Sequence, residues 1–153
     1  MKKTEPLLLL TARFMMGGVF AYAGFAKLRE PPEWFLQVLE QYALIPHVAV
    51  PVLARVIPWL EWLLGAMLLS GYLCRFSALS LSVFSLFSIV LTGYQFFAGQ
   101  LPEECGCFGS GTIELTPAQS ISLNLFLVFS GLLLFMRTNH PYSLDAVIRK
   151  RAA

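Results

Sequence analysis

The chain has 153 residues, of which 57% are hydrophobic and 13% charged, and its mean hydropathy is +0.68. An ordinary soluble domain needs more polar surface than this to cover its exterior. The net charge of +2 is too small, and the Lys and Arg residues are too scattered, for a nucleic-acid-binding surface. We therefore expect a single integral membrane domain over residues 1–153, with membrane lipid as part of its solvent.

Four apolar stretches are long enough to cross a hydrocarbon core, which takes about 20 helical residues. They cover residues 7–28, 51–73, 76–98 and 117–136. The first stretch also resembles a cleavable signal peptide, because Lys2 and Lys3 precede an apolar run. Arg13 interrupts that run, which continues to Lys27, so we favour a retained membrane helix. The predicted fold class is all-α, an integral membrane four-helix bundle.

A further short helix is predicted between the first two spans. After Pro31 and Pro32, the segment Glu33 to Tyr42 repeats apolar residues at helical spacing. Its other face is polar, so we expect this helix to lie along the outer interface or to cap the bundle there. The fourth span should begin sharply, because Thr116 is a favourable N-cap followed by Pro and, three positions on, Gln119.

The orientation follows from the Lys and Arg residues in short connections, which favour the cytoplasmic side. Lys2 and Lys3, Arg75, and the tail with Arg137, Arg149, Lys150 and Arg151 all fall on one side of a four-span bundle. The connection 100–116 has glutamates but no Lys or Arg. Lys27 and Arg29 oppose this assignment, although acidic residues accompany them. We predict that both termini are cytoplasmic and that connection 100–116 lies on the outer side of the membrane.

Two charged residues are predicted inside the membrane. Arg13 shares one face of the first span with Gly17, Phe20, Gly24 and Lys27. The glycines on that face would allow another helix to approach closely, and the arginine should point into the bundle. Its expected partner is Glu61 in the second span. We favour an ion pair that fixes the register of the two helices, with a proton or ligand role as the alternative.

Cys105 and Cys107 flank Gly106 in the connection assigned to the outer side, where thiols meet an oxidising environment. We predict that they form a redox pair, whose short disulfide ring would be strained and readily exchanged. Glu103 and Glu104 should keep their thiol pKa values high unless Lys27 or Arg29 approaches. A metal site would need further ligands, so none is predicted. Cys74, at the opposite end of a span, should be inert.

Motifs along nearly the whole chain resemble the MauE/DoxX-like redox-associated membrane proteins. The resemblance is carried by these residues in this order: Arg13-Phe14-Met15-Met16-Gly17, Phe20, Ala23-Gly24, Lys27-Leu28, Pro32, Phe35, Tyr42, Pro46, Glu61, Gly65, Gly71 and Cys105-Gly106-Cys107-Phe108-Gly109. The last motif is similar to that of the MauE branch. This resemblance implies a role in methylamine utilisation, in the maturation of a disulfide-rich periplasmic dehydrogenase subunit, with a thioredoxin-like partner. It also implies a location in the inner membrane of a bacterium, with Cys105 and Cys107 on the periplasmic side.

These observations leave three functional hypotheses. The first is thiol–disulfide exchange between Cys105/Cys107 and a periplasmic thioredoxin-like protein, with a disulfide-rich secreted protein as the substrate. The chain would then be a component of a thiol–disulfide oxidoreductase, and whether it is itself an enzyme stays open. The second is a non-enzymatic membrane scaffold or assembly factor. The third is a quinone-linked thiol oxidoreductase, which needs a quinone pocket and a second thiol pair that the sequence does not identify. No cofactor is therefore expected.

Overall fold

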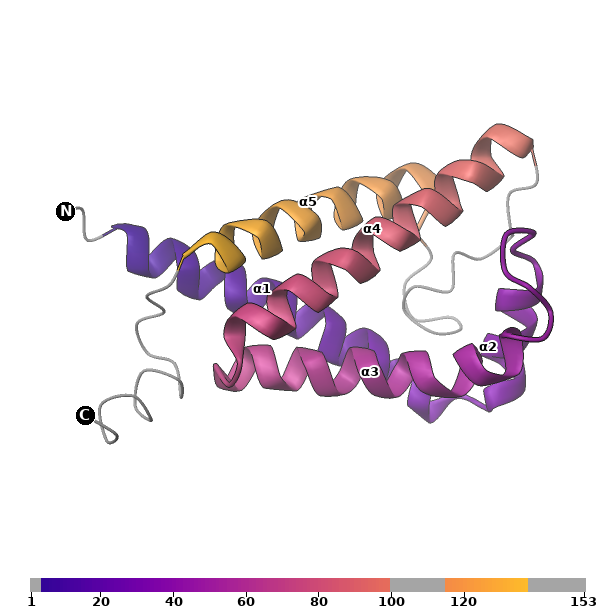
Figure 1. The fold of residues 1–153 in the computed structure, drawn as a ribbon, viewed down its shortest axis with the longest axis horizontal. Coiled ribbons are helices and arrows are strands. Elements are labelled where there is room, and N and C mark those ends of the chain that lie inside the picture. The colour runs from indigo at the N-terminus through magenta and orange to yellow at the C-terminus, as the bar shows by residue number, and fades with distance from the viewer. Residues whose placement is uncertain (1–3, 100–114, 138–153) are drawn as a thin grey trace.

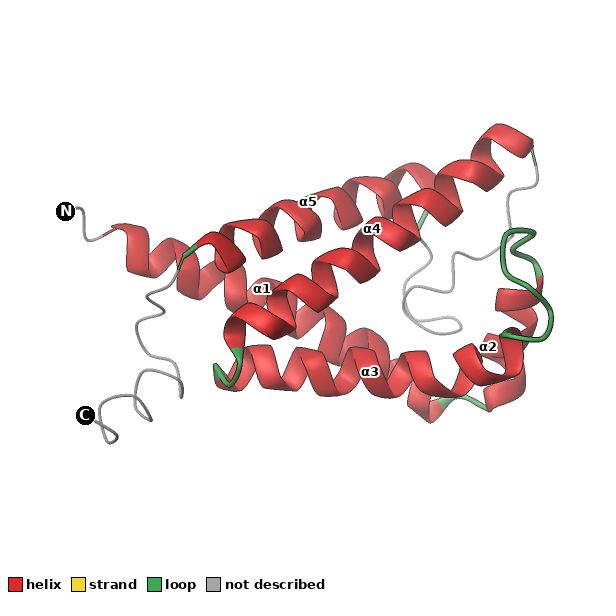
Figure 2. Cartoon of the chain, viewed as in Figure 1, coloured by secondary structure: helices red, strands yellow, loops and turns green. Residues whose placement is uncertain are grey.

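The computed structural model describes residues 4–99 and 115–137, and all regular structure in this part of the chain is helical (Figure 2). The helices are α1 (Thr4–Arg29), α2 (Pro32–Glu40), α3 (Val50–Ser70), α4 (Cys74–Ala98) and α5 (Pro117–Met136). Among them, α1, α3, α4 and α5 are long and apolar enough to cross a membrane. The chain is thus a multi-pass membrane protein with the predicted helical bundle.

The connection between α3 and α4 lies earlier in the chain than the sequence predicted, at residues 71–73 instead of 74–75. We expected the second span to continue to residue 73 and the third to begin at 76, but α3 ends at Ser70 and α4 begins at Cys74. Gly71 ends α3 because it adopts a left-handed conformation, with φ of 77°. The backbone N–H groups of Gly71 and Tyr72 then donate to Leu68 and Met67, which satisfies the last carbonyls of the helix.

The membrane helices form two antiparallel pairs. Helix α1 packs along α3, and α4 packs along α5. Figure 1 shows that α4 starts beside the end of α3 and diverges from it toward the end of the bundle that carries α2. The two ends of the bundle therefore differ. One carries the α3–α4 turn, and the other carries α2, the last residues of α4 and the first residues of α5.

Helix α2 closes the diverging end of the bundle. Its side chains Phe35, Val38 and Leu39 are buried against the first half of α3 and against Leu91 of α4. The Gln95 side chain of α4 also donates a hydrogen bond of 2.6 Å to the backbone carbonyl of Gln41, just after α2. The predicted short helix is confirmed, and it caps the bundle.

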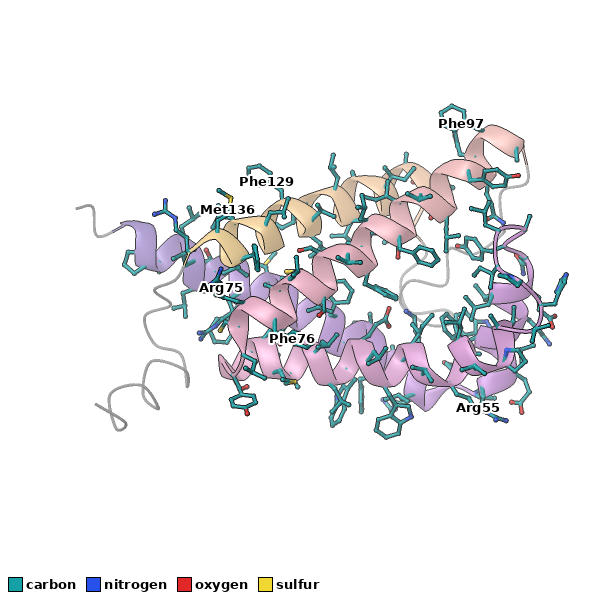
Figure 3. The ribbon with its side chains drawn as sticks, in the orientation of Figure 1. Arg55, Arg75, Phe76, Phe97, Phe129 and Met136 are labelled. Atoms are coloured by element: carbon teal, nitrogen blue, oxygen red, sulfur yellow. The ribbon has the colours of Figure 1, made fainter. Side chains whose placement is uncertain are left out.

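The remaining core runs along the bundle axis, while large apolar side chains also cover the outside. Met16, Leu68, Leu81 and Leu134 are buried between the four long helices. Phe76, Phe97, Phe129 and Met136 are exposed and point away from the bundle (Figure 3). Such an outer surface is stable when acyl chains surround it.

Specific polar contacts fix the ends of α5. At its start, Thr116 and Gln119 form the predicted capping box, in which each backbone N–H donates to the other residue's side-chain oxygen. At its end, the Arg75 Nε of α4 donates to the carbonyl of Phe135 at 3.2 Å. Arg75 therefore satisfies one of the carbonyls that the end of a helix leaves without an intrahelical partner.

Candidate functional site

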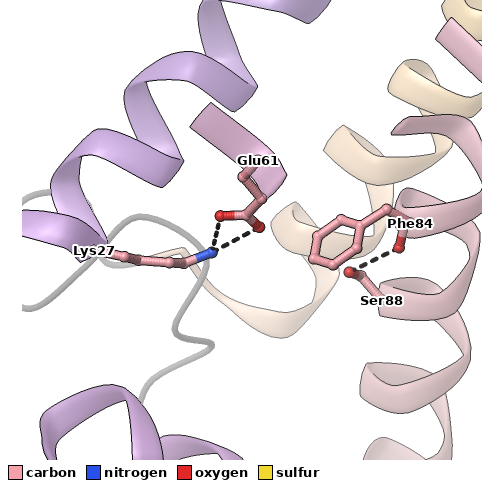
Figure 4. Close-up of polar contacts among 4 residues, drawn as sticks. All are labelled: Lys27, Glu61, Phe84 and Ser88. Carbon is pink, nitrogen blue, oxygen red and sulfur yellow. Dashed lines mark hydrogen bonds and ion pairs between the residues drawn. The ribbon is translucent and has the colours of Figure 1, made fainter. Parts of the chain in front are cut away.

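A buried ion pair joins the first two membrane helices. The Lys27 ammonium near the end of α1 donates to both carboxylate oxygens of Glu61 in α3, at 2.8 and 2.7 Å (Figure 4). Each side chain is only 4% exposed. Buried charges are stable inside a membrane bundle only when they are paired. The contact between Lys27 and Glu61 therefore allows both residues to stay charged in the interior.

Glycines bring the two helices close enough for the pair to form. A methyl group at Gly24 would lie 2.7 Å from the carbonyl oxygen of Pro58, and one at Gly65 would lie 2.9 Å from that of Gly17. The backbones of α1 and α3 are therefore in direct contact, as expected for small residues at membrane helix interfaces. Because α1 and α3 are antiparallel, Glu61 lies level with Gly24, which faces Pro58 and Trp62. Lys27 lies one helical turn farther along α1, and its long side chain reaches back to the Glu61 carboxylate.

The predicted pairing of Arg13 with Glu61 is wrong. Arg13 is buried on the predicted face of α1, with its guanidinium 5.5 Å from the ring centroid of Phe14. However, it lies about 21 Å from Lys27 along the helix, at a rise of about 1.5 Å per residue. Because Gly17 packs beside Gly65 and Leu69, Arg13 is level with the far end of α3. Glu61 is therefore out of its reach.

The ion pair lines a cavity of about 100 Å³ inside the bundle, which we call the central cavity. All of the described helices contribute to its walls. Most lining residues are apolar, such as Phe20, Phe35 and Leu127, while Lys27 and Glu61 are its charged groups. Figure 4 shows the ion pair facing Phe84 and Ser88 of α4, which line the same cavity. The arrangement suits an apolar molecule with a polar group at one side.

Comparison with known families supports the resemblance seen in the sequence. The model of the family described as "Methylamine utilisation protein MauE" matches residues 5–137, which include every described helix. The chain belongs to the MauE family. The matched region contains both Lys27 and Glu61 and all residues that line the central cavity.

Two curated relatives carry the name "Methylamine utilization protein MauE". The protein from Paracoccus denitrificans is 25% identical over 148 residues, which cover 97% of this chain and 78% of the relative. The protein from Methylophilus methylotrophus is 31% identical over 106 residues, which cover 67% of this chain and 54% of the relative. No solved structure shows significant similarity to the chain.

The fold places several polar residues of this MauE-family protein on the walls of a cavity or a groove. Ser88, Thr92 and Asn124 come from two different helices and all line the central cavity. Arg55 was not identified as a candidate. It lies on the α2 side of α3 (Figure 3) and lines an outer groove that also reaches Lys27. In the sequence, Arg55 could have been noticed as a charged residue in the second turn of a predicted membrane helix.

The predicted thiol pair, Cys105 and Cys107, lies outside the described residues. The two cations proposed to influence it have other contacts: Lys27 binds Glu61, and the exposed Arg29 lies with its guanidinium 5.5 Å from the ring centroid of Phe25. Cys74 is completely buried at the start of α4. Within residues 4–99 and 115–137, no group of three or more His, Cys, Asp or Glu side chains could hold a metal ion.

Proposed function

We propose that this protein is an accessory membrane protein of methylamine utilisation that supports thiol–disulfide exchange through Cys105 and Cys107. Membership of the MauE family supports the pathway, because the family and both curated relatives carry the methylamine utilisation name. The thiols support the chemistry, because they are separated by a single glycine and lie in a connection between two membrane helices.

The distribution of charge over the two ends of the bundle is the observation that carries the proposal. Arg75 and Arg137 belong to the end with the α3–α4 turn, and the connection containing both thiols joins α4 and α5 at the other end (Figure 1). Lys27, one of the cations at the α2 end, is neutralised by Glu61. The positive-inside rule then favours a periplasmic thiol pair, in the compartment where disulfides persist.

The exchange itself conserves electrons and atoms. A thiolate of a periplasmic thioredoxin-like protein attacks one sulfur of the Cys105–Cys107 disulfide, and the other cysteine leaves as a thiolate. The second thiol of the partner then breaks the mixed disulfide, so the partner becomes oxidised and the pair reduced. The disulfide has then moved outward to the partner, which can pass it on to a disulfide-rich secreted protein. The same steps in reverse return the disulfide to Cys105 and Cys107 and leave the partner reduced.

The test is to trap the mixed disulfide. A Cys107→Ser variant should accumulate a covalent complex through Cys105, which mass spectrometry of the non-reduced protein identifies. The matched control is Cys74→Ser, which also loses one thiol but keeps Cys105 and Cys107. It should accumulate no complex, because Cys107 is present to release the partner. Growth on methylamine should be lost in the Cys105→Ser/Cys107→Ser double variant at unchanged membrane abundance. Full growth of the double variant would reject exchange and favour the scaffold hypothesis.

A further inference from the structure

We infer that the central cavity is a binding site for a membrane-soluble quinone, that is, a planar ring with hydrogen-bond-accepting oxygens and an apolar tail. This inference concerns binding alone and does not depend on the thiol exchange proposed above. It rests on the aromatic walls of the cavity, its hydrogen-bond donors and its access from the lipid.

The cavity has walls that suit a single ring, which would fill it completely. Its volume of about 100 Å³ is smaller than that of an apolar cavity of about 150 Å³ that binds benzene in another protein, so a quinone ring would have to extend into the opening of the cavity. Phe20 and Phe84 line it and meet edge to face, with ring centroids 6.0 Å apart. Phe35 and Phe87 also line it. Aromatic walls favour a planar ring, which can stack on them or meet their edges.

The cavity also offers hydrogen-bond donors from both helix pairs. An ammonium group carries three N–H donors, and Glu61 accepts two of those of Lys27, so one is left for a ligand oxygen. Asn124 of α5 uses one N–H on the Ser120 carbonyl and has a second, and Thr92 of α4 adds a hydroxyl group. Lys27 belongs to one helix pair and Asn124 and Thr92 to the other, so donors from both pairs are available to the oxygens of a ring.

The cavity reaches the outer surface where an apolar ligand would arrive. Phe87 lines it and is 48% exposed on the lipid-facing side of α4. Leu53 of α3 lines it as well and is partly buried. Helices α3 and α4, which carry these residues, diverge from each other (Figure 1), so a ring can enter from the bilayer while its tail stays among the acyl chains. A highly charged, water-soluble ligand would meet mostly apolar walls.

The binding experiment uses the full chain in phospholipid nanodiscs, with Cys105 and Cys107 replaced by Ser so that exchange cannot contribute. A radiolabelled decyl-tailed benzoquinone should bind saturably. Ser88→Leu places a larger apolar side chain in the cavity and should weaken binding by about tenfold or more. The matched control, Ser122→Leu, changes an exposed serine of α5 outside the cavity and should leave the affinity unchanged. Thermal unfolding establishes that both variants are folded.

A second arm tests recognition of the ring oxygens. Decylbenzene has the same tail and no carbonyl, and should bind about tenfold more weakly than the quinone. The Lys27→Met/Glu61→Met double variant removes the donor without leaving a buried charge unpaired, and should weaken quinone binding while binding decylbenzene as before. The inference is overturned if the quinone does not bind saturably, if Ser88→Leu binds it like the unmodified chain, or if decylbenzene binds equally well. Displacement of the quinone by added phospholipid would assign the cavity to a lipid chain instead.

Discussion

Lys27 and Glu61, 34 positions apart in the sequence, meet through two hydrogen bonds in the interior of the bundle. Glu61 lies near the middle of α3 and Lys27 in the last turn of α1. The pair therefore fixes how far one helix is displaced along the other. It also brings a cation to the wall of the central cavity, where an apolar bundle would otherwise offer few donors.

Breaking this pair on one side should destabilise the protein more than removing it altogether. Lys27→Met leaves the Glu61 carboxylate buried without its partner, which should cost about 3–5 kcal/mol of unfolding free energy. The Lys27→Met/Glu61→Met double variant should recover much of that loss. Unfolding in detergent mixtures measures both, and Arg29→Met is the control, because Arg29 is exposed. Equal losses in the single and double variants would contradict a mutually dependent pair.

The contact between α1 and α3 should tolerate no added side chain at Gly24. Gly24→Ala would press a methyl group against the backbone of Pro58 and Trp62, and we expect a loss of about 1–3 kcal/mol. The control on the same helix is Gly18→Ala, since a methyl group there meets no atom within 4 Å. Thermal unfolding of the two variants in the same lipid should separate them clearly. Similar melting temperatures would refute the close approach of the helices.

The orientation can be tested with cysteines introduced at exposed loop positions, in a background where Cys74, Cys105 and Cys107 are Ser. Val48 lies in the α2–α3 connection and is 91% exposed, so Val48→Cys places a thiol at the surface. It should react with a membrane-impermeant maleimide in intact spheroplasts. Tyr72→Cys, in the α3–α4 turn, should react only after the membrane is permeabilised. The opposite labelling pattern would place the thiol connection in the cytoplasm.

The oxidation state of the thiols is a separate prediction. In protein isolated without reductant, Cys105 and Cys107 should resist alkylation and become reactive after mild reduction, because a strained disulfide is readily reduced. A thioredoxin-like dithiol should suffice as the reductant. Mass spectrometry of the alkylated peptides gives the answer, with Cys74 as the internal reference because its burial should make its alkylation independent of reduction. Alkylation of both thiols before reduction would mean that they are not paired.

The sequence by itself determined the membrane helices. A hydrocarbon core demands long apolar segments with internally bonded backbones, so each of the four predicted spans corresponds to a helix in the structure. Local chemistry also determined the ends of elements, as with the capping box of Thr116 and Gln119. The buried face of α1 was predictable for the same reason, because helical periodicity depends only on spacing along one chain.

The tertiary structure decided which residues of different helices meet. Arg13 and Lys27 lie on the same face of α1, so the face alone does not decide which of them pairs with Glu61. The position of α1 along α3 places Lys27, and not Arg13, within reach of Glu61. That position depends on the backbone contacts at Gly17, Gly24 and Gly65, whose depth a helical pattern does not encode. The central cavity is likewise a property of the divergence between the two helix pairs, because its donors come from α1, α4 and α5 and no single segment contains them.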